Sequence, residues 1–280
     1  SQLGEIDGVK GPDRFLPFFL GHEAGAVVEA VGPGVQKTKP GDHVVLHWRP
    51  GTGADAEPAR YRWNGRTVNA GRVTTFQEHT VVSENRLTVI PKSVPFETAA
   101  LYGCAVTTGF GIVANDAALK KGETVLVLGS GGIGQVQILA ARDAGASIII
   151  AADLHPNKLA LARKNGATHT LISGPGLGRR IQKILRGRPL DVVLENTGKK
   201  NVIEFAYESA GPRGRVILVG VPDSRQKAEI DTLPLHFGKI LTGSHGGDAR
   251  PDRDIPRILT LQRRRRWNLA GMTNPGYTLD

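Results

Sequence analysis

The most constraining feature of this chain is a glycine-rich turn between an apolar run and an amphipathic segment. The apolar run spans residues 124–128, and Gly129, Gly131 and Gly134 follow it in a G-x-G-x-x-G pattern. Such glycines allow a sharp turn, close approach of the backbone to a pyrophosphate, and close packing of the next helix on the strand. A phosphate there would meet a helix N-terminus, where N–H groups favour negative charge. The pattern therefore predicts a dinucleotide-binding turn.

A second apolar run supports this interpretation. Residues 147–152 lead into Asp153, which follows the last glycine by about twenty residues, the spacing of an acid that contacts the ribose of a dinucleotide. A carboxylate there accepts from the 2′-hydroxyl and repels a 2′-phosphate, and residues 154–157 contain no arginine or serine cluster. We therefore expect NAD rather than NADP. The alternative is an ordinary tight turn, with Asp153 capping the next helix.

The pattern of the sequence changes near residue 106. Before it, short runs at 26–31, 42–46 and 78–82 are separated by glycine and proline, which predicts an all-β, barrel-like domain. After it, predicted strands alternate with helices, as in a doubly wound parallel sheet, so the fold class is α/β. The predicted strands are 124–128, 147–152, 191–194 and 215–220, and the helices 133–144, 156–165 and 201–210.

This change also predicts the domain organisation. We expect a β domain at 1–105, a nucleotide-binding domain at 106–250, and a partial return to the first domain at 251–280. The stretch 49–72, rich in glycine, alanine and proline, is expected to be one long irregular loop.

Composition excludes several classes of protein. The 280 residues are 40% hydrophobic and 22% charged, enough for two domains with cores. We find no bilayer-spanning segment and no signal peptide. Cys104 is the only cysteine, which excludes an internal disulfide and favours a cytoplasmic location. The net charge is +10, but the arginine run 263–266 is local and aromatics are only 5%, so we expect a solvated helix face and no nucleic-acid partner.

Two further residues suggest a metal. His22, which is followed by Glu23, and Cys104 are of the types that zinc prefers as ligands. Taken alone, His22 is more often a hydrogen-bonded structural histidine and Cys104 a small buried residue. The residue types alone therefore do not establish that the chain binds a metal, and the surrounding motifs are needed to judge it.

Together the motifs resemble the zinc-dependent alcohol dehydrogenases of the medium-chain dehydrogenase/reductase family. The resemblance extends from the first residues to about Gly247. It implies a GroES-like catalytic domain followed by a Rossmann domain, and reversible hydride transfer between an alcohol and NAD. The motifs are Gly21-His22-Glu23 with Gly25, and the segments 27–32, 39–44, 103–109, 127–134 and 219–222.

The resemblance also implies roles for single residues. His22 and Cys104 match zinc ligands, Glu23 matches the carboxylate beside the metal, and Ser1 matches a proton-relay hydroxyl, so these four are the expected catalytic residues. For Lys158 a solvated helix lysine is an equally good interpretation. The expected cofactor contacts are Thr108, Gly129, Gly131, Gly132, Ile133, Gly134, Asp153, Lys158 and Val219.

Three departures from the family change these expectations. No cysteine precedes His22, where the family has its first ligand, so we expect a chain that begins just inside the active site, and residues 277–280 are expected to be a break in the returning segment. No cysteine lies between His47 and His79, where many relatives bind a structural zinc. We therefore expect one catalytic zinc and no structural zinc. The lobe is expected either to be held by aromatic packing of Trp48, Tyr61, Trp63 and Phe76 or to be mobile.

Two other functions stay open. A zinc-free quinone or enoyl reductase of the same superfamily would usually lack both His22 and Cys104 and prefer NADPH, which Asp153 opposes. A non-catalytic NAD-binding fragment would differ in metal content and turnover. The expected partners are a small alcohol or carbonyl substrate and further copies of the chain, in a homodimer or homotetramer joined near 216–218, with no membrane partner.

Overall fold

The computed structural model describes residues 2–8, 17–265, 267–273 and 276, and the chain divides into two compact units. One unit comprises 108–248 among these residues, and the other comprises 2–8, 17–107 and the residues from Ala249 onward. The predicted proton-relay residue Ser1 and the predicted break at 277–280 lie outside the described residues.

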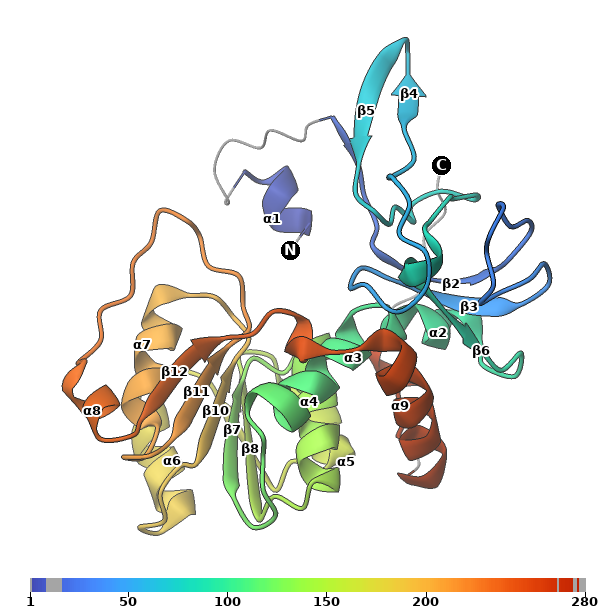
Figure 1. Ribbon diagram of the computed structural model, residues 1–280. Coiled ribbons are helices and arrows are strands. Elements are labelled where there is room, and N and C mark those ends of the chain that lie inside the picture. Colours follow the sequence, from blue (N-terminus) through green and yellow to red (C-terminus); the bar gives the residue numbers. More distant parts are fainter. Residues whose placement is uncertain (1, 9–16, 266, 274–275, 277–280) are drawn as a thin grey trace. The chain divides into compact units, whose positions relative to one another are not determined.

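The 108–248 unit is built on a six-stranded sheet in the order β12-β11-β10-β7-β8-β9 (Figure 1). Every neighbouring pair is parallel, so the predicted α/β fold with a doubly wound sheet is confirmed. The order reverses at β7, and the crevice outside the carboxyl ends of such strands is the usual ligand site. The strands are β7 (Thr124–Leu128), β8 (Ile148–Asp153), β9 (His169–Ile172), β10 (Val192–Glu195), β11 (Arg215–Leu218) and β12 (Ile240–Gly243).

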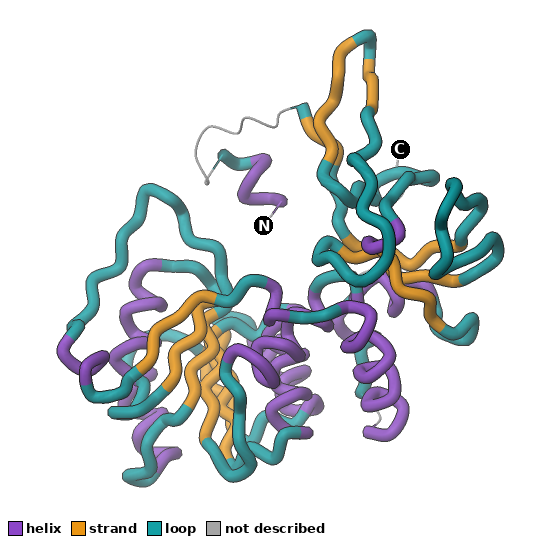
Figure 2. Tube along the Cα trace, viewed as in Figure 1, coloured by secondary structure: helices purple, strands orange, loops and turns teal. Residues whose placement is uncertain are grey.

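Helices cover both faces of this sheet. Figure 1 shows α4 and α5 on one face and α6 and α7 on the other, and Figure 2 shows the same strands between helices. Leu126, Ile150 and Val193 from the sheet pack with Ile181 and Leu185 of α6 in the main core cluster. The helices are α3 (Ala105–Gly111), the π-helical turn η2 (Ile112–Asp116), α4 (Gly132–Asp143), α5 (Pro156–Asn165), α6 (Leu177–Leu185), α7 (Lys200–Ser209), α8 (Leu233–His236) and the 3₁₀ turn η3 (Gly246–Asp248).

The other unit contains two small sheets. One is antiparallel, in the order β2-β3-β6, and buries Val44, Leu46 and Leu87 on one side. The second has the order β1-β5-β4. The strands are β1 (Phe18–Phe19), β2 (Glu23–Val27), β3 (His43–His47), β4 (Tyr61–Trp63), β5 (Arg66–Ala70) and β6 (Leu87–Ile90). The helices are α1 (Gln2–Ile6), α2 (Phe96–Tyr102) and α9 (Pro251–Arg265), with the 3₁₀ turns η1 (Glu84–Arg86) and η4 (Ala270–Met272).

Three strand predictions need correction. The strand predicted at 26–31 begins earlier and ends at Val27. Residues 78–82 form no strand, and β6 occupies the edge of β3 instead. The hydroxyl of Thr80 donates to the carbonyl of Thr74 at 2.7 Å, a local side-chain bond that competes with strand pairing. The strand near 216–218 is β11, which lies between β10 and β12, so it offers no edge for joining sheets.

The stretch 49–72 is not wholly irregular, because β4 and β5 form an antiparallel hairpin in it (Figure 2). Its turn is Asn64-Gly65, with φ of 48° and 75°. Two positive φ values are what a type I′ hairpin turn needs, and Asn-Gly is its preferred sequence.

Only part of the aromatic set predicted to hold this lobe is buried. Trp63 and Phe76 are each 63% exposed, and only Tyr61 of the hairpin makes a ring contact, with Phe19 at 5.0 Å between centroids. Trp48 and Tyr61 are half-buried, but Trp63 and Phe76 are too exposed to pack the lobe together, so other contacts must help to hold it.

Two carboxylates supply those contacts. Glu84 accepts hydrogen bonds from the backbone N–H of Ala54 (2.9 Å), Lys37 and Gln36 (2.7 Å), and these bonds hold its pKa below the ordinary value. Asp252, in the first turn of α9, accepts from the hydroxyl of Thr52 at 2.9 Å and pairs with Lys37. Burial raises the pKa of Asp252, but these bonds outweigh burial and leave the pKa lowered. The lobe is therefore tied to residues on both sides of it in sequence.

The described helices are short or polar relative to a membrane-spanning helix. No single one of them is both long and apolar enough to cross a bilayer. The pair Phe96–Tyr102 and Ala105–Asp116 meets the length and composition test only when joined across a 43° bend, and Tyr102, Val106 and Ile112 within it are fully buried.

Candidate cofactor and catalytic site

The glycine-rich turn lies between β7 and α4. Gly129 has φ of +87°, a conformation that side-chain-bearing residues rarely adopt, and a Cβ added to Gly134 would lie 2.2 Å from the carbonyl oxygen of Gly129. The fold itself therefore requires both glycines. Gly131 differs, because no atom of the described residues lies within 4 Å of a Cβ built there. Open space at Gly131 fits a ligand that approaches the backbone closely.

Asp153 stands at the end of β8, beside this turn. Its Oδ2 accepts from the backbone N–H of Ser130 at 2.7 Å, and its Oδ1 accepts from the N–H of His155 at 2.9 Å. The side chain does not cap α5, whose N-cap residue is His155 without a side-chain bond. A carboxylate offers about four acceptor positions, so both oxygens can still accept from a ribose diol.

A buried glutamine locks the turn in place. Gln135 is 2% exposed, and its Nε2 donates to the carbonyls of Ser130 (2.8 Å) and Lys158 (3.0 Å). Its Oε1 accepts from Asn165 at 3.0 Å. The sequence analysis missed this residue, although a glutamine on the apolar face of a helix was a usable signal. The hydroxyl of Ser130 is buried and has no hydrogen-bond partner among the described residues, so a polar ligand group would satisfy it.

The neighbouring strands complete the edge of the site. At the end of β10, Nδ2 of Asn196 donates to the carbonyls of Leu128 and Gly129, each at 3.2 Å, and its Oδ1 accepts from Gln137 at 2.8 Å. The backbone N–H of Val219 donates to Glu195 at 2.8 Å and extends the β10–β11 pairing by one residue. Val219 was predicted, whereas Asn196 and Gln137 were not.

Thr108 and Lys158 are the two remaining residues predicted to contact the cofactor. Thr108 is 6% exposed in α3, and a Cβ at the adjacent Gly109 would lie 2.7 Å from Cβ of Val136, so α3 and α4 pack closely there. Lys158 lies in α5, and its carbonyl is tied to the turn through Gln135. The predicted cofactor residues thus all belong to one unit, and Gly129, Gly131, Asp153 and Val219 lie at or just beyond the carboxyl ends of its strands. The open turn at Gly131 fits a dinucleotide.

Three of the predicted catalytic residues, His22, Glu23 and Cys104, lie in the other unit. Glu23 begins β2, and its Oε2 accepts from the N–H of Ala105 at 3.4 Å, which places it beside the backbone of Cys104. A Cβ at Gly103 would lie 2.6 Å from Cβ of Glu23, so only glycine permits this approach. Burial raises the pKa of Glu23 to about 7, against the opposing effect of backbone hydrogen bonds. His22 and Cys104 are both half-buried.

The structure does not assemble a complete metal site from these residues. In the part of the chain that is described, no group of three or more His, Cys, Asp or Glu is placed to hold a metal ion. Zinc needs at least three protein ligands in a catalytic site. The ligand set His22, Glu23 and Cys104 therefore stays a prediction, and we derive no catalytic step through a metal.

Comparison with known proteins shows to which family the chain belongs. The model described as "Alcohol dehydrogenase GroES-like domain" matches residues 3–92, and that described as "Zinc-binding dehydrogenase" matches residues 132–261. The chain is 31% identical, over 100% of its length and 82% of the relative's, to an NDMA-dependent alcohol dehydrogenase of Amycolatopsis methanolica. The chain belongs to the zinc-type alcohol dehydrogenases of the medium-chain family. The resemblance found in the sequence motifs is thereby confirmed.

Two further relatives of the chain support the same family assignment. The chain is 33% identical to the S-(hydroxymethyl)glutathione dehydrogenase of Escherichia coli O1:K1, over 89% of its own length and 75% of the relative's. The crystal structure of benzyl alcohol dehydrogenase from Acinetobacter calcoaceticus superposes with a TM-score of 0.84 at 27% identity, covering 96% of the chain and 80% of that structure. The alcohol dehydrogenase is therefore an oxidoreductase with a GroES-like and a Rossmann unit, and its family implies NAD and zinc.

Proposed function

We propose that this dehydrogenase transfers a hydride between a small alcohol and NAD, with NAD strongly preferred to NADP. The single observation that supports this most directly is the carboxylate of Asp153, fixed by the N–H groups of Ser130 and His155 at the end of β8. A fixed negative charge there accepts from a ribose diol and repels a 2′-phosphate. NAD, when bound, supplies the acceptor for the hydride.

The residues of the Rossmann unit would divide the binding of this cofactor among them. The backbone N–H groups of the first turn of α4 would face the pyrophosphate, and the open space at Gly131 would let it approach the backbone. Asp153 would orient the adenosine ribose, with Lys158 as a second contact, and Thr108 and Val219 would contact the nicotinamide half. In the GroES-like unit, we propose a single catalytic zinc and no structural zinc.

The named relatives suggest which substrates to test first. Benzyl alcohol, S-(hydroxymethyl)glutathione and short aliphatic alcohols can be compared with NAD and with NADP, following the nicotinamide absorbance. We expect turnover of at least one alcohol with NAD and little with NADP. NADPH-dependent reduction of quinones without alcohol oxidation would instead support the zinc-free reductase alternative.

We also propose that the protein is a cytoplasmic homodimer joined along β12. That strand is an edge of the six-stranded sheet, and the apolar residues Leu233, Phe237 and Ile240 beside it are 61%, 70% and 46% exposed. Exposed apolar side chains on a sheet edge favour pairing with another copy. Sedimentation equilibrium of the protein and of Phe237→Glu tests this, because the substitution should shift a dimer toward monomer.

A further inference from the structure

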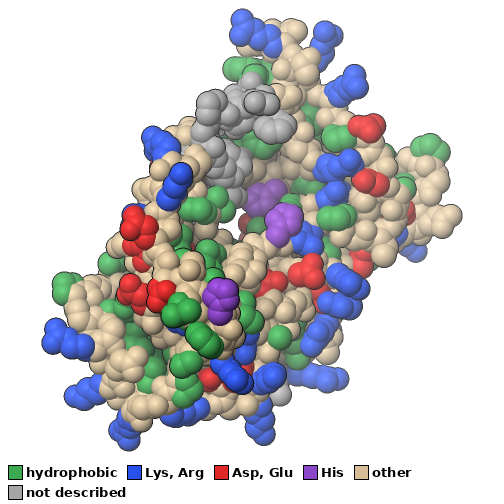
Figure 3. All heavy atoms as spheres, turned by 60° about the vertical axis from the view of Figure 1, so that its left-hand side comes forward, with side chains coloured by type: hydrophobic (Ala, Val, Ile, Leu, Met, Phe, Trp, Pro, Cys, Tyr) green, Lys and Arg blue, Asp and Glu red, His purple; other side chains and the backbone are tan. Residues whose placement is uncertain are grey.

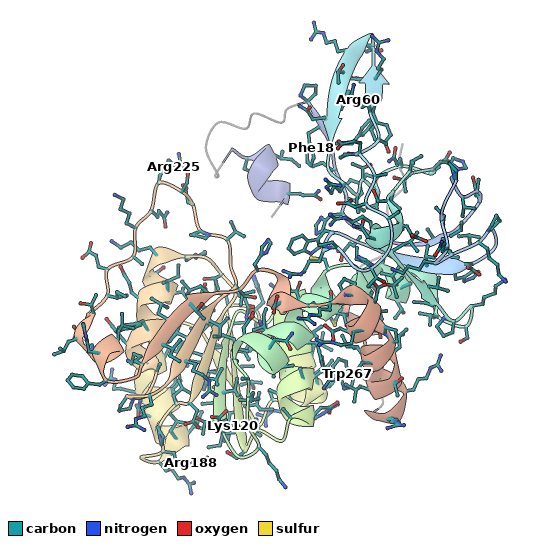
Figure 4. The ribbon with its side chains drawn as sticks, in the orientation of Figure 1. Phe18, Arg60, Lys120, Arg188, Arg225 and Trp267 are labelled. Atoms are coloured by element: carbon teal, nitrogen blue, oxygen red, sulfur yellow. The ribbon has the colours of Figure 1, made fainter. Side chains whose placement is uncertain are left out.

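The Rossmann unit contains a second hollow that the cofactor does not use. A cavity of about 670 Å³ lies between α6 and the strands β8 and β9. This volume is in the range of small-molecule sites. Ile148 begins β8 and His169 begins β9, so the lining includes the amino ends of these strands and extends along β9 to Leu171, whereas the glycine-rich turn follows the carboxyl end of β7. Figure 4 labels Arg188 and Lys120 at the former end and Arg225 at the latter.

The charge of the lining has one sign. Arg180, Lys183, Arg186 and Arg188 all line the cavity. Within the described residues its lining contains no aspartate or glutamate. Figure 3 shows blue Lys and Arg side chains gathered along the lower margin of the molecule. Four cations around one hollow repel each other, and an anion placed among them relieves that repulsion.

Arg180 points to the same conclusion by its hydrogen bonds. Its Nη2 donates to the carbonyl of Ile172 at 2.8 Å, which holds the guanidinium against the end of β9. Its Nε is buried and meets no acceptor from the described residues. A buried donor without a partner costs free energy, so Arg180 keeps unused hydrogen-bonding capacity, and it lies in the lining of the cavity.

The guanidinium of Arg188 is held in position by uncharged acceptors, which leave its positive charge unpaired by them. Its Nη2 donates to the carbonyl of Gly122 and to the hydroxyl of Ser147, each at 2.9 Å. Both acceptors are uncharged, so the position of the guanidinium is set while its charge remains available to a ligand.

The remaining lining is apolar. Ile148, Leu171 and Ile184 line the cavity and are only partly buried. An inorganic ion alone would leave this surface in contact with water. A ligand with both an anionic head and a short hydrocarbon body would cover it and gain hydrophobic free energy.

We propose that this cavity binds a small amphiphilic anion, with a phosphate or carboxylate head beside Arg180 and Lys183 and an apolar body over Leu171 and Ile184. The ligand is distinct from the dinucleotide and from the alcohol. The proposal does not depend on the proposed function, because every group it uses belongs to the β9–α6 side of the sheet.

The test uses hexyl phosphate as the probe, with inorganic phosphate and hexanol as partial probes, in calorimetric titrations of the full chain at constant ionic strength. Hexyl phosphate should bind at least about tenfold more tightly than either partial probe, since both charge and apolar burial contribute. Equal affinity for inorganic phosphate would overturn the proposal and indicate an adventitious ion only.

Variants locate the probe. Arg180→Gln with Lys183→Gln should weaken hexyl phosphate about tenfold or more, whereas Arg179→Gln, an exposed arginine of the same helix outside the cavity, should change it less than twofold. Lys183→Gln alone, at an exposed position, gives the same direction if the double variant folds poorly. Equal losses in the Arg179 control would show general charge attraction and not a site.

A competition experiment separates this cavity from the cofactor site. Saturating NAD should leave the affinity for hexyl phosphate unchanged. Displacement of the probe by NAD would place it at the glycine-rich turn and overturn the proposal, without bearing on the proposed dehydrogenase activity.

Discussion

The backbone N–H of Ser130 donates a 2.7 Å hydrogen bond to the carboxylate of Asp153. The two residues come from different strand ends, the first from the turn after β7 and the second from the end of β8. The bond therefore couples the turn that would face the pyrophosphate to the acid that would face the ribose. A substitution at Asp153 must disturb both, and its effects have to be separated by measuring stability as well as affinity.

Asp153→Ser should weaken NAD about tenfold or more and NADP much less. The substitution removes charged hydrogen bonds to the ribose and relieves the repulsion of a 2′-phosphate. Fluorescence titration of both reduced cofactors measures the ratio, and Asp153→Asn, which keeps the shape and one acceptor, serves as the matched control. Unchanged NAD affinity in Asp153→Ser would remove this residue from the site.

Gly131→Ala and Gly134→Ala should fail in different ways. A Cβ at Gly131 meets no described atom, whereas one at Gly134 would lie 2.2 Å from a backbone oxygen. Gly131→Ala should therefore keep its melting temperature and lose cofactor affinity, while Gly134→Ala should melt several degrees lower. Thermal scans with and without NAD distinguish the two. A Gly131→Ala protein that binds NAD normally would show that the backbone there does not approach the cofactor.

His22→Ala and Cys104→Ala should each abolish alcohol oxidation while NAD affinity changes less than about twofold. NAD affinity should be retained because both residues belong to the GroES-like unit, whereas the cofactor residues belong to the Rossmann unit. Elemental analysis should find at most one zinc per chain in the unsubstituted protein and less in either variant. Retained zinc and turnover in Cys104→Ala would return Cys104 to the role of an ordinary thiol.

Glu84→Gln should lower the melting temperature near neutral pH by a few degrees, because a neutral amide accepts less strongly from the N–H groups of Ala54, Lys37 and Gln36. The folded-state pKa of Glu84 lies below the ordinary 4.5, so its stabilisation is present above pH 4.5 and is lost as pH falls through the folded value. The difference in melting temperature between Glu84→Gln and the unsubstituted protein should therefore become smaller in acid.

The control for this prediction is Glu57→Gln, an exposed glutamate in the same lobe. It should melt like the unsubstituted protein at every pH. A pH-independent difference for Glu84→Gln would mean that the shape of the side chain, and not its charge, holds the lobe.

The sequence predicted the centre of the Rossmann unit well. The strand predicted at 124–128 is β7 to the residue, and the helix predicted at 156–165 is α5. Both follow from local patterns, an apolar run before glycines and a proline-initiated amphipathic segment. The hairpin of β4 and β5 was equally local, since Asn64-Gly65 is a strong turn signal, but its flanking residues do not alternate cleanly and the signal was missed.

By itself the sequence determined which segments bury a face, where the chain turns, and which acid follows the glycines, because these depend on residues close together in the chain. Only the tertiary structure decided that Asp252 binds Thr52 across 200 positions, that Asn196 fixes the turn at Gly129, and that β12 lies at an edge of the sheet while β11 does not. The physical reason is that periodicity records whether a side chain is buried but not what it meets there. A carboxylate or an amide takes its role from partners that folding brings to it from distant parts of the chain.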